Sequence, residues 1–384
     1  MSHSMDIGQT KQLFLDDAIV EEMDQVSRTL NRPTKHPGNP LLPAVPEHAS
    51  SWDAGLVSTF ASVLFDGEEK CFKMWYGLGD VEGDDEEFAL AYATSQDGTT
   101  WHKPELDLVE YNGSRANNLL HPIDHWWVRC IFKDPSAPPE ARYKSTHPSG
   151  MLYMDGVVKP EVTREHYWEM RTAMQHEGMG LDQIAEKMQM HQIIRGAVSP
   201  DGLRWTVLEE PLRDLGSRTL DGEYYVIYDE DKGEYVAYHR GHLERRRAVR
   251  RSTGKSFDEW SEPQFVFMPD GQDPVDADVY GSGYVRYPHK VAGASGTGGG
   301  HPAGGSGTES GGIYSGRLHL MFLPFYHRTT STVDVQLATS RDGLLWSRPE
   351  RVPIIERGEY DSLYSRRDLV VLNEEEWGLP FMGA

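Results

Sequence analysis

Acidic side chains stand at the start of several strand-like runs that lie far apart in the sequence. They are Asp53, Asp221 with Glu223, Asp276 with Asp278, and Asp361. In a fold whose innermost strands begin around one axis, such side chains converge on a shared pocket. Cleavage of a glycosidic bond needs two carboxyl groups, one protonated to assist the leaving group and one ionised as nucleophile or base. Carboxylates held close together push their pKa values apart, so one of them can stay protonated near neutral pH.

Four of these acids are the candidate catalytic residues, because each lies at the expected start of an innermost strand: Asp53, Asp221, Asp276 and Asp361. Two of them, Asp53 and Asp361, also follow an aromatic residue. The chain holds 60 acidic residues, and Asp is common at strand ends and turns. Position alone therefore does not separate a catalytic acid from an ordinary turn residue.

Other side chains near the same strand starts are candidates for binding a substrate. The loop 35–40, KHPGNP, is stiffened by two prolines and either holds its polar side chains over the pocket or is a plain connector. Trp126 and Trp127 are adjacent, so in a strand they face opposite ways, and one of them is free to serve as a sugar platform. The candidate substrate-binding residues are His36, Asn39, Trp52, Trp127, Glu223, Asp278, Tyr280 and Arg286.

A repeated motif indicates how these candidates are positioned. The pattern Ser-x-Asp-Gly-x-x-Trp, a repeat of the Asp-box kind, occurs within 94–101, 198–205 and 339–346, and a degraded copy ends at Trp260. Each copy follows a strand-like run and leads into another, and Asp-Gly between two such runs is a strong turn signal. We expect the repeated Trp to cover the turn and pack between neighbouring sheets, rather than to bind sugar.

The spacing of the repeats predicts the fold. Two insertions interrupt the period: a Met-rich, helix-like segment at 151–190 and a Gly/Ser-rich segment at 292–312. Without them the period is about 55 to 65 residues, which suits a four-stranded propeller blade. We predict an all-β chain with one domain over 1–384, a five-bladed β-propeller with a helical insertion around 160–190. The N-terminal runs 11–22 and 26–33 are expected to complete the last blade, because a propeller must close its ring.

Composition narrows the range of partners. The formal net charge of −22 repels phosphate backbones and anionic lipid, which excludes nucleic acid and membrane surfaces as partners and favours a carbohydrate. Cys71 and Cys130 lie in apolar runs and are expected to be buried, reduced thiols. With no secretory signal in this sequence, we expect a cytoplasmic protein, while a secreted mature form stays open. No His or Cys residues have the spacing of a zinc site, and we expect no required cofactor. A structural calcium ion stays open, because its oxygen ligands have no recognisable sequence pattern.

The motifs together resemble a known group of proteins. The segments LFLDDAIVEE, KHPGNPLL, ATSQDGTTWHKPELDLVEYNGSRANNLL, DPVDADVYG, VDVQLATSRDGLLW and GEYDS, in this order, are similar to bacterial proteins related to the N-terminal propeller of the invertase and arabinanase glycosidases. The resemblance implies a five-bladed propeller with a deep axial pocket. It implies that Asp53 is the nucleophile or base and that Asp221 tunes the pocket. The general acid of that family is usually a Glu on a later blade, where this chain offers Asp276, Asp278 or Asp361.

Three functions remain open at this point. The first is a glycoside hydrolase acting on an oligosaccharide. The second is a glycoside phosphorylase, in which phosphate replaces water and Arg286, Arg366 or Arg367 would supply a basic site. The third is a non-catalytic carbohydrate-binding propeller. The Met-rich insertion is either a lid, a contact in a homo-oligomer, or a surface excursion, because Met suits adaptable apolar surfaces.

Overall fold

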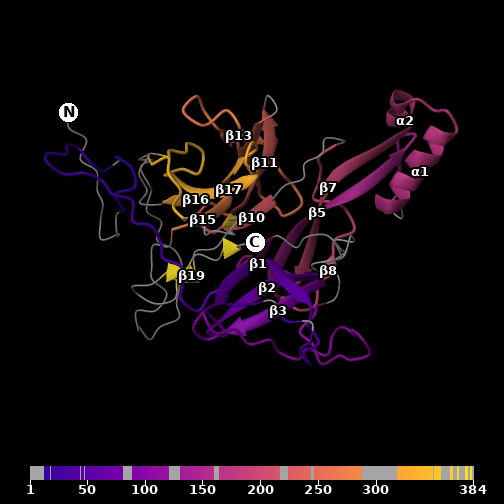
Figure 1. Cartoon of the computed structure of the whole chain (residues 1–384), viewed down its shortest axis with the longest axis horizontal. Helices are drawn as coiled ribbons and strands as arrows, with labels where there is room; N and C mark the ends of the chain where they lie inside the picture. Colours follow the sequence, from indigo (N-terminus) through magenta and orange to yellow (C-terminus); the bar gives the residue numbers. More distant parts are fainter. Residues whose placement is uncertain are drawn as a thin grey trace.

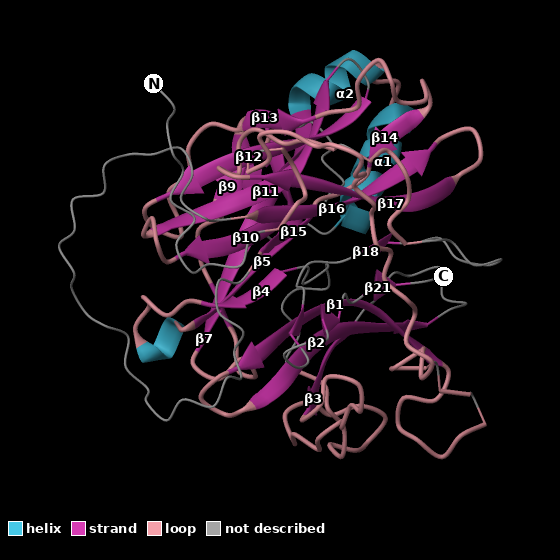
Figure 2. Cartoon of the chain, turned by 90° about the vertical axis from the view of Figure 1, so that its left-hand side faces the viewer, coloured by secondary structure: helices cyan, strands magenta, loops and turns pink. Residues whose placement is uncertain are grey.

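The computed structural model describes residues 13–17, 19–43, 45–46, 48–80, 89–120, 130–159, 164–216, 224–243, 246–287, 318–348 and 350–355, with short strand segments between 364 and 382. Over these parts the chain is built almost entirely of antiparallel strands, and helices form only a small part of it (Figure 2). The expectation of an all-β chain is thus confirmed. The predicted Gly/Ser-rich insertion at 292–312 lies outside the described residues.

Four antiparallel sheets follow one another along the chain. Sheet 1 holds β1 (Leu56–Asp66), β2 (Cys71–Asp80) and β3 (Ala89–Ser95). Sheet 2 holds β4 (Cys130–Lys133), β5 (Tyr143–Met154), β7 (Met188–Ser199), β8 (Thr206–Val207) and β9 (Arg213–Asp214), with β6 (Val157–Lys159) paired to β5. Sheet 3 holds β10 (Tyr224–Asp229), β11 (Glu234–Leu243), β12 (Arg246–Gly254) and β13 (Gln264–Phe267).

Sheet 4 holds β14 (Ala277–Val279), β15 (Gly283–Arg286), β16 (His319–His327) and β17 (Thr332–Ser340). Both β14 and β15 pair with β16, so they are two halves of one interrupted strand. Near the C-terminus β18 (Tyr364–Ser365) pairs with β21 (Phe381–Met382), and β19 (Val370–Val371) pairs with β20 (Trp377–Gly378). In Figure 1 the four sheets lie around a common centre in sequence order, the arrangement expected for consecutive propeller blades.

Neighbouring sheets pack face to face, and alternation along each strand makes this possible. Cys130 and Phe132 of β4 belong to the apolar core between sheets 2 and 3, whereas Ile131 belongs to the core between sheets 1 and 2. A third core joins sheets 3 and 4. Successive side chains in a strand point to opposite faces of its sheet. A strand whose sheet lies between two neighbouring sheets must therefore carry apolar side chains on both faces. Both cysteines are buried free thiols, as expected.

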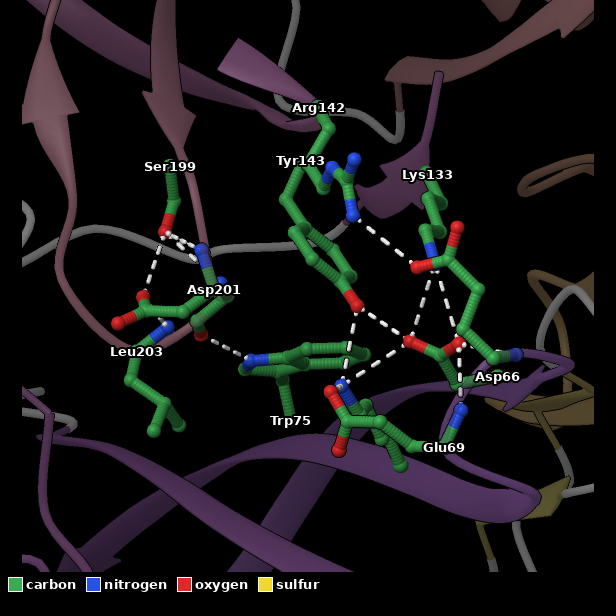
Figure 3. A network of polar contacts seen from close by, with 12 residues as sticks. Asp66, Glu69, Trp75, Lys133, Arg142, Tyr143, Ser199, Asp201 and Leu203 are labelled. Atoms are coloured by element: carbon green, nitrogen blue, oxygen red, sulfur yellow. Dashed lines mark hydrogen bonds and ion pairs between the residues drawn. The ribbon is translucent and has the colours of Figure 1, made fainter. Parts of the chain in front are cut away.

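The three intact Ser-x-Asp-Gly turns have the same hydrogen bonds. In the copy after β7, the Ser199 hydroxyl accepts from the Gly202 N–H at 2.8 Å, and the Asp201 carboxylate accepts from two further backbone N–H groups at 2.8 Å each (Figure 3). Gly202 has a φ of 78°, which favours glycine. The Trp side chains of the repeat pack into the cores between sheets, which confirms the expectation for Trp205 and Trp346.

The far ends of the first strands are tied together by carboxylates. Asp66, at the end of β1, accepts hydrogen bonds from Tyr143 at 2.5 Å and from Lys133 at 3.1 Å, both of sheet 2 (Figure 3). Asp134, just after β4, accepts a hydrogen bond from Tyr235 of sheet 3. Asp229, at the end of β10, lies 3.2 Å from Arg286 of sheet 4. The first strands therefore end on one side of the molecule, and their starts share the opposite side, which we call the starting end.

The Met-rich insertion is a projecting arm. Strands β5 and β7 extend past the part of sheet 2 where β4 pairs with β5, and they continue as a hairpin up to the pair Met154–Met188. The helices α1 (Arg164–His176) and α2 (Leu181–Lys187) lie at the tip of this hairpin (Figure 1, upper right). The expected helical insertion is confirmed. Leu152, Ile184 and Met188 form a small separate core with five further Met side chains and Tyr167 around it. Because β5 runs antiparallel to β4, the arm leaves sheet 2 at the starting end.

The N-terminal segment bridges sheets 4 and 1. Leu13, Leu15 and Leu30 pack on the outer face of sheet 4, and Leu42 packs on the outer face of sheet 1. An ion pair between Arg341 and Asp16 at 2.8 Å fastens it to sheet 4. Over 13–17 and 19–43 the chain forms no strand, in contrast to the two closing strands expected there. Closure of a fifth blade stays a prediction.

Candidate functional site

The starting end of sheets 3 and 4 gathers charged side chains around Asp278. This residue lies in β14, and its carboxylate is buried at the junction with sheet 3. It accepts a hydrogen bond from the Arg247 guanidinium at 2.8 Å and another from the Arg247 backbone N–H at 3.3 Å. A second guanidinium, that of Arg328 at the end of β16, lies 3.9 Å away. Asp278 is therefore a carboxylate held between two cations.

Tyr280 follows directly after β14 and lies beside the same arginines. Its ring centre lies 4.2 Å from the Arg240 guanidinium and 5.2 Å from that of Arg247. Its carbonyl oxygen accepts from the Arg240 Nε–H at 2.8 Å, and its ring lies 5.5 Å from that of Tyr326. Of the expected binding residues, Asp278 and Tyr280 are thus brought together by the structure.

Asp276 lies near this group but in a different setting. Its carboxylate is near the surface and accepts from the Thr329 backbone N–H at 3.2 Å. The hydrogen bonds from Thr329 hold the pKa of the Asp276 carboxyl below its ordinary value. Its carbonyl oxygen accepts from Arg328 at 3.2 Å. In this setting Asp276 is an ionised carboxylate and not a proton donor near neutral pH.

Asp53 precedes β1 and is also held as an anion. Only 2% of its side chain is exposed, and its carboxylate lies 2.5 Å from the Lys103 ammonium. Ser51 donates a second hydrogen bond. Burial by itself raises the pKa of the Asp53 carboxyl, but the bonds from Lys103 and Ser51 outweigh burial and hold the pKa below its ordinary value. This carboxylate suits the role of base or nucleophile and is covered in the conformation described.

The remaining described candidates lie apart from the Asp278 group. Trp52 packs edge-on against Tyr111 at 5.9 Å in the core of sheet 1. His36 accepts a hydrogen bond from Gly38 within its own exposed turn, and the Asn39 N–H closes the same turn. The His36 and Asn39 side chains make no hydrogen bond with a candidate acid among the described residues.

Arg286 lies at the far end of its sheet, away from Asp278. It ends β15 and forms ion pairs with Asp229 and Asp231 at the far end of sheets 3 and 4. Eight residues of an extended strand separate it from Asp278, about 26 Å at 3.3 Å per residue. Arg286 therefore lies apart from the Asp278 group, and its role in binding a substrate stays a prediction. Four further candidates, Asp221, Glu223, Trp127 and Asp361, lie outside the described residues, as do Arg366 and Arg367.

Sequence reasoning did not single out the basic side chains of this site. The run 245–251 suggests a solvated strand face, yet Arg246 and Arg247 reach across to sheet 4 and Ala248 and Val249 are buried. The signal available in the sequence was a dense run of arginines within a strongly acidic chain. Among the residues with described positions, no group of three or more His, Cys, Asp or Glu side chains is arranged to hold a metal ion.

No protein-family model and no curated protein matches the chain. Solved structures that are similar to it include several glycoside hydrolases. One is a thermostable family-43 glycoside hydrolase, with 11% identity and a TM-score of 0.45 over 81% of this chain and 80% of that one. Another is a fructofuranosidase from Schwanniomyces occidentalis, with 13% identity and a TM-score of 0.43 over 84% of this chain and 50% of that one.

A third neighbour is a β-1,2-mannobiose phosphorylase from Listeria innocua, with 16% identity and a TM-score of 0.34 over 91% of this chain and 74% of that one. These identities and TM-scores carry no activity over to this chain. Within the described residues, no helix has the length and apolar character needed to cross a membrane.

Proposed function

We propose that this protein is a glycoside hydrolase that cleaves an oligosaccharide at the starting end of its sheets. The observation that carries the proposal is the common side on which the first strands begin, which follows from the ties between their far ends at Asp66, Asp134 and Asp229. We propose that carboxylates at these strand starts meet one glycosidic bond there.

The roles of the acids follow from their settings. Asp53 is paired with Lys103 and has a lowered pKa, which fits the ionised base or nucleophile. Asp276 also has a lowered pKa, which makes it a poor proton donor. We therefore assign the general acid to Asp221 or Asp361, the other two catalytic candidates from the sequence. This differs from a general acid at Asp276, where hydrogen bonds from Thr329 favour the ionised form, or at Asp278, whose carboxylate is buried against Arg247.

The proposal is tested by chromatography of the products formed from a broad panel of oligosaccharides, with and without phosphate. The proteins compared are the wild type, Asp53→Asn, Asp221→Asn, Asp361→Asn and, as a control, Asp258→Asn at an exposed position. We expect new reducing sugar from the wild type and the control. We expect at least a hundredfold less from Asp53→Asn and from one of the other two variants, since a general acid or base contributes about 10²–10⁴ in rate.

Two outcomes would replace the proposal. Products that form only with phosphate would identify a phosphorylase. Binding of sugars without any product would identify a carbohydrate-binding propeller. Because Asp53 is buried, each variant is first checked for an unchanged unfolding temperature, and the exposed-site control shows the effect of a neutralised carboxylate elsewhere.

A further inference from the structure

A cluster of cations surrounds the single carboxylate of Asp278. We call it the arginine cluster, and its members are Arg240, Arg246, Arg247 and Arg328. The cluster stands in a chain whose formal net charge is −22. A concentration of positive charge in such a chain attracts anions to one place on the surface.

Most hydrogen bonds of the arginine cluster go to neutral groups. Arg246 donates to the Ala277 carbonyl at 2.5 Å, Arg240 to the Tyr280 carbonyl at 2.8 Å, and Arg328 to the Val275 carbonyl at 2.9 Å. A carbonyl oxygen satisfies an N–H donor but does not cancel a unit of charge. Among the described residues, the three guanidinium groups of Arg246, Arg247 and Arg328 border two carboxylates, those of Asp278 and Asp276.

Donors of this region also reach the surface. The Arg328 side chain is 44% exposed and that of Arg247 is 27% exposed. His242 is exposed and lies directly opposite Arg247 in the β11–β12 pair, which places the two Cβ atoms about 5 Å apart. Its imidazole makes no hydrogen bond with the described part of the chain. Three donors thus border the same carboxylate without being fully used.

The charged groups around His242 affect its pKa, as expected for an imidazole beside the arginine cluster and Asp278. Burial first, and then the charges of Arg240 and Arg247, lower the pKa of the His242 imidazole, while Asp278 acts in the opposite direction. Nearby, the rings of Tyr280 and Tyr326 provide apolar faces against which a sugar ring can pack. Cationic donors beside aromatic rings suit a ligand that combines a ring with an oxyanion.

We infer that Arg247, Arg328 and His242 bind the carboxylate of an acidic sugar, so that the substrate contains a uronic acid. The inference rests on the proposed function in that the ligand is a carbohydrate. Guanidinium groups recognise carboxylates and phosphates with the same paired N–H donors. Inorganic phosphate is therefore the second source of such an anion, and the experiment separates the two.

The test measures binding by NMR titration of the full-length protein. The probes are D-galacturonate, D-glucuronate and D-mannuronate, their neutral counterparts galactose, glucose and mannose, and inorganic phosphate. The variants are Arg328→Gln and His242→Gln, both at exposed positions, with Arg204→Gln as the matched control on the exposed turn after β7. Arg247 is left intact because its loss would strand the buried Asp278.

We expect one uronate to bind about tenfold or more tightly than its neutral counterpart. We expect each of the two cluster variants to weaken that binding by about tenfold, and the control to leave it unchanged. Phosphate binding with the same variant dependence, and no uronate preference, would overturn the sugar-carboxylate assignment in favour of phosphate. Equal affinity for charged and neutral sugars, with no phosphate binding, would show that the arginines serve only to join sheets 3 and 4.

Failure of this inference is distinguishable from failure of the proposed function. Uronate binding without cleavage of any oligosaccharide would leave the anion site standing and refute the hydrolase. Cleavage of neutral oligosaccharides by a protein that binds no anion would leave the hydrolase standing and refute the anion site.

Discussion

Replacing Asp66 with Asn removes the charge at the centre of the tie between sheets 1 and 2. Asp66 is buried and accepts from Tyr143, Lys133 and Lys73 (Figure 3). Burial alone raises the pKa of the Asp66 carboxyl, but the bonds from Tyr143 and the lysines outweigh burial and hold it well below its ordinary range. The substitution leaves the Lys73 ammonium, only 2% exposed, with Glu69 as its one remaining anionic partner among the described residues.

The expected loss in the free energy of unfolding is about 3–5 kcal/mol, the usual cost of removing one member of a buried ion pair. Glu68→Gln is the matched control, because Glu68 contacts Lys133 in the same network but is 66% exposed. The loss of the Glu68 charge should cost much less, because solvent screens an exposed ion pair. Urea unfolding followed by tryptophan fluorescence measures both. Equal losses for the two variants would refute the view that burial gives this network its strength.

The pH dependence provides a second check on Asp66. Since the folded-state pKa lies below the unfolded value of about 3.9, the contribution of Asp66 is fully present above that value. It is lost as the pH falls through the folded-state pKa. The difference in stability between the wild type and Asp66→Asn should therefore be constant from pH 6 to 8 and shrink below about pH 4. A difference that stays constant into acid would contradict the assigned cause.

Three further predictions concern the turns, the anion site and the arm. Gly202→Ala should cost about 1–3 kcal/mol more in thermal unfolding than Gly113→Ala, since both have positive φ but a Cβ at Gly202 would lie 2.7 Å from the Trp75 ring; equal costs would contradict this. The charged groups around the His242 imidazole are Arg240, Arg247, Arg250 and Asp278. Binding of a uronate should raise the pKa of His242, and the affinity for the uronate should therefore increase as the pH falls, both of which NMR titration can follow. A His242 pKa that does not change on binding would count against the site. Replacing 151–191 with an Asn-Gly turn should leave the main unfolding transition within a few degrees, because the arm has its own core; loss of the transition would show that the sheets depend on the arm.

Local chemistry made some features predictable from the sequence. The Ser-x-Asp-Gly turns depend on hydrogen bonds within a few residues, so Ser199, Asp201 and Gly202 specify their turn without help from distant segments. The helical insertion was predictable for the same reason, because its helices and their Met-rich core lie within one continuous stretch.

Features that depend on distant partners were not predictable. Lys103 comes 50 residues after Asp53, and nothing near Asp53 in the sequence indicates that a lysine covers it. The position of Arg286 at the far end was not predictable, because the sequence does not show that β14 and β15 are halves of one long strand. The arginine cluster was missed because several of its partners, such as the carbonyl oxygens of Ala277 and Tyr280, are backbone groups that carry no sequence signal.

The central claim is that this propeller-like chain breaks glycosidic bonds with carboxylates at its starting end. The most direct measurement is the rate at which the wild type and a correctly folded Asp53→Asn variant release reducing ends from an oligosaccharide, with uronic-acid oligosaccharides included. Release by the wild type, reduced at least a hundredfold in the variant, is the result we predict. Equal release by both proteins, or none from the wild type on any oligosaccharide, would contradict it.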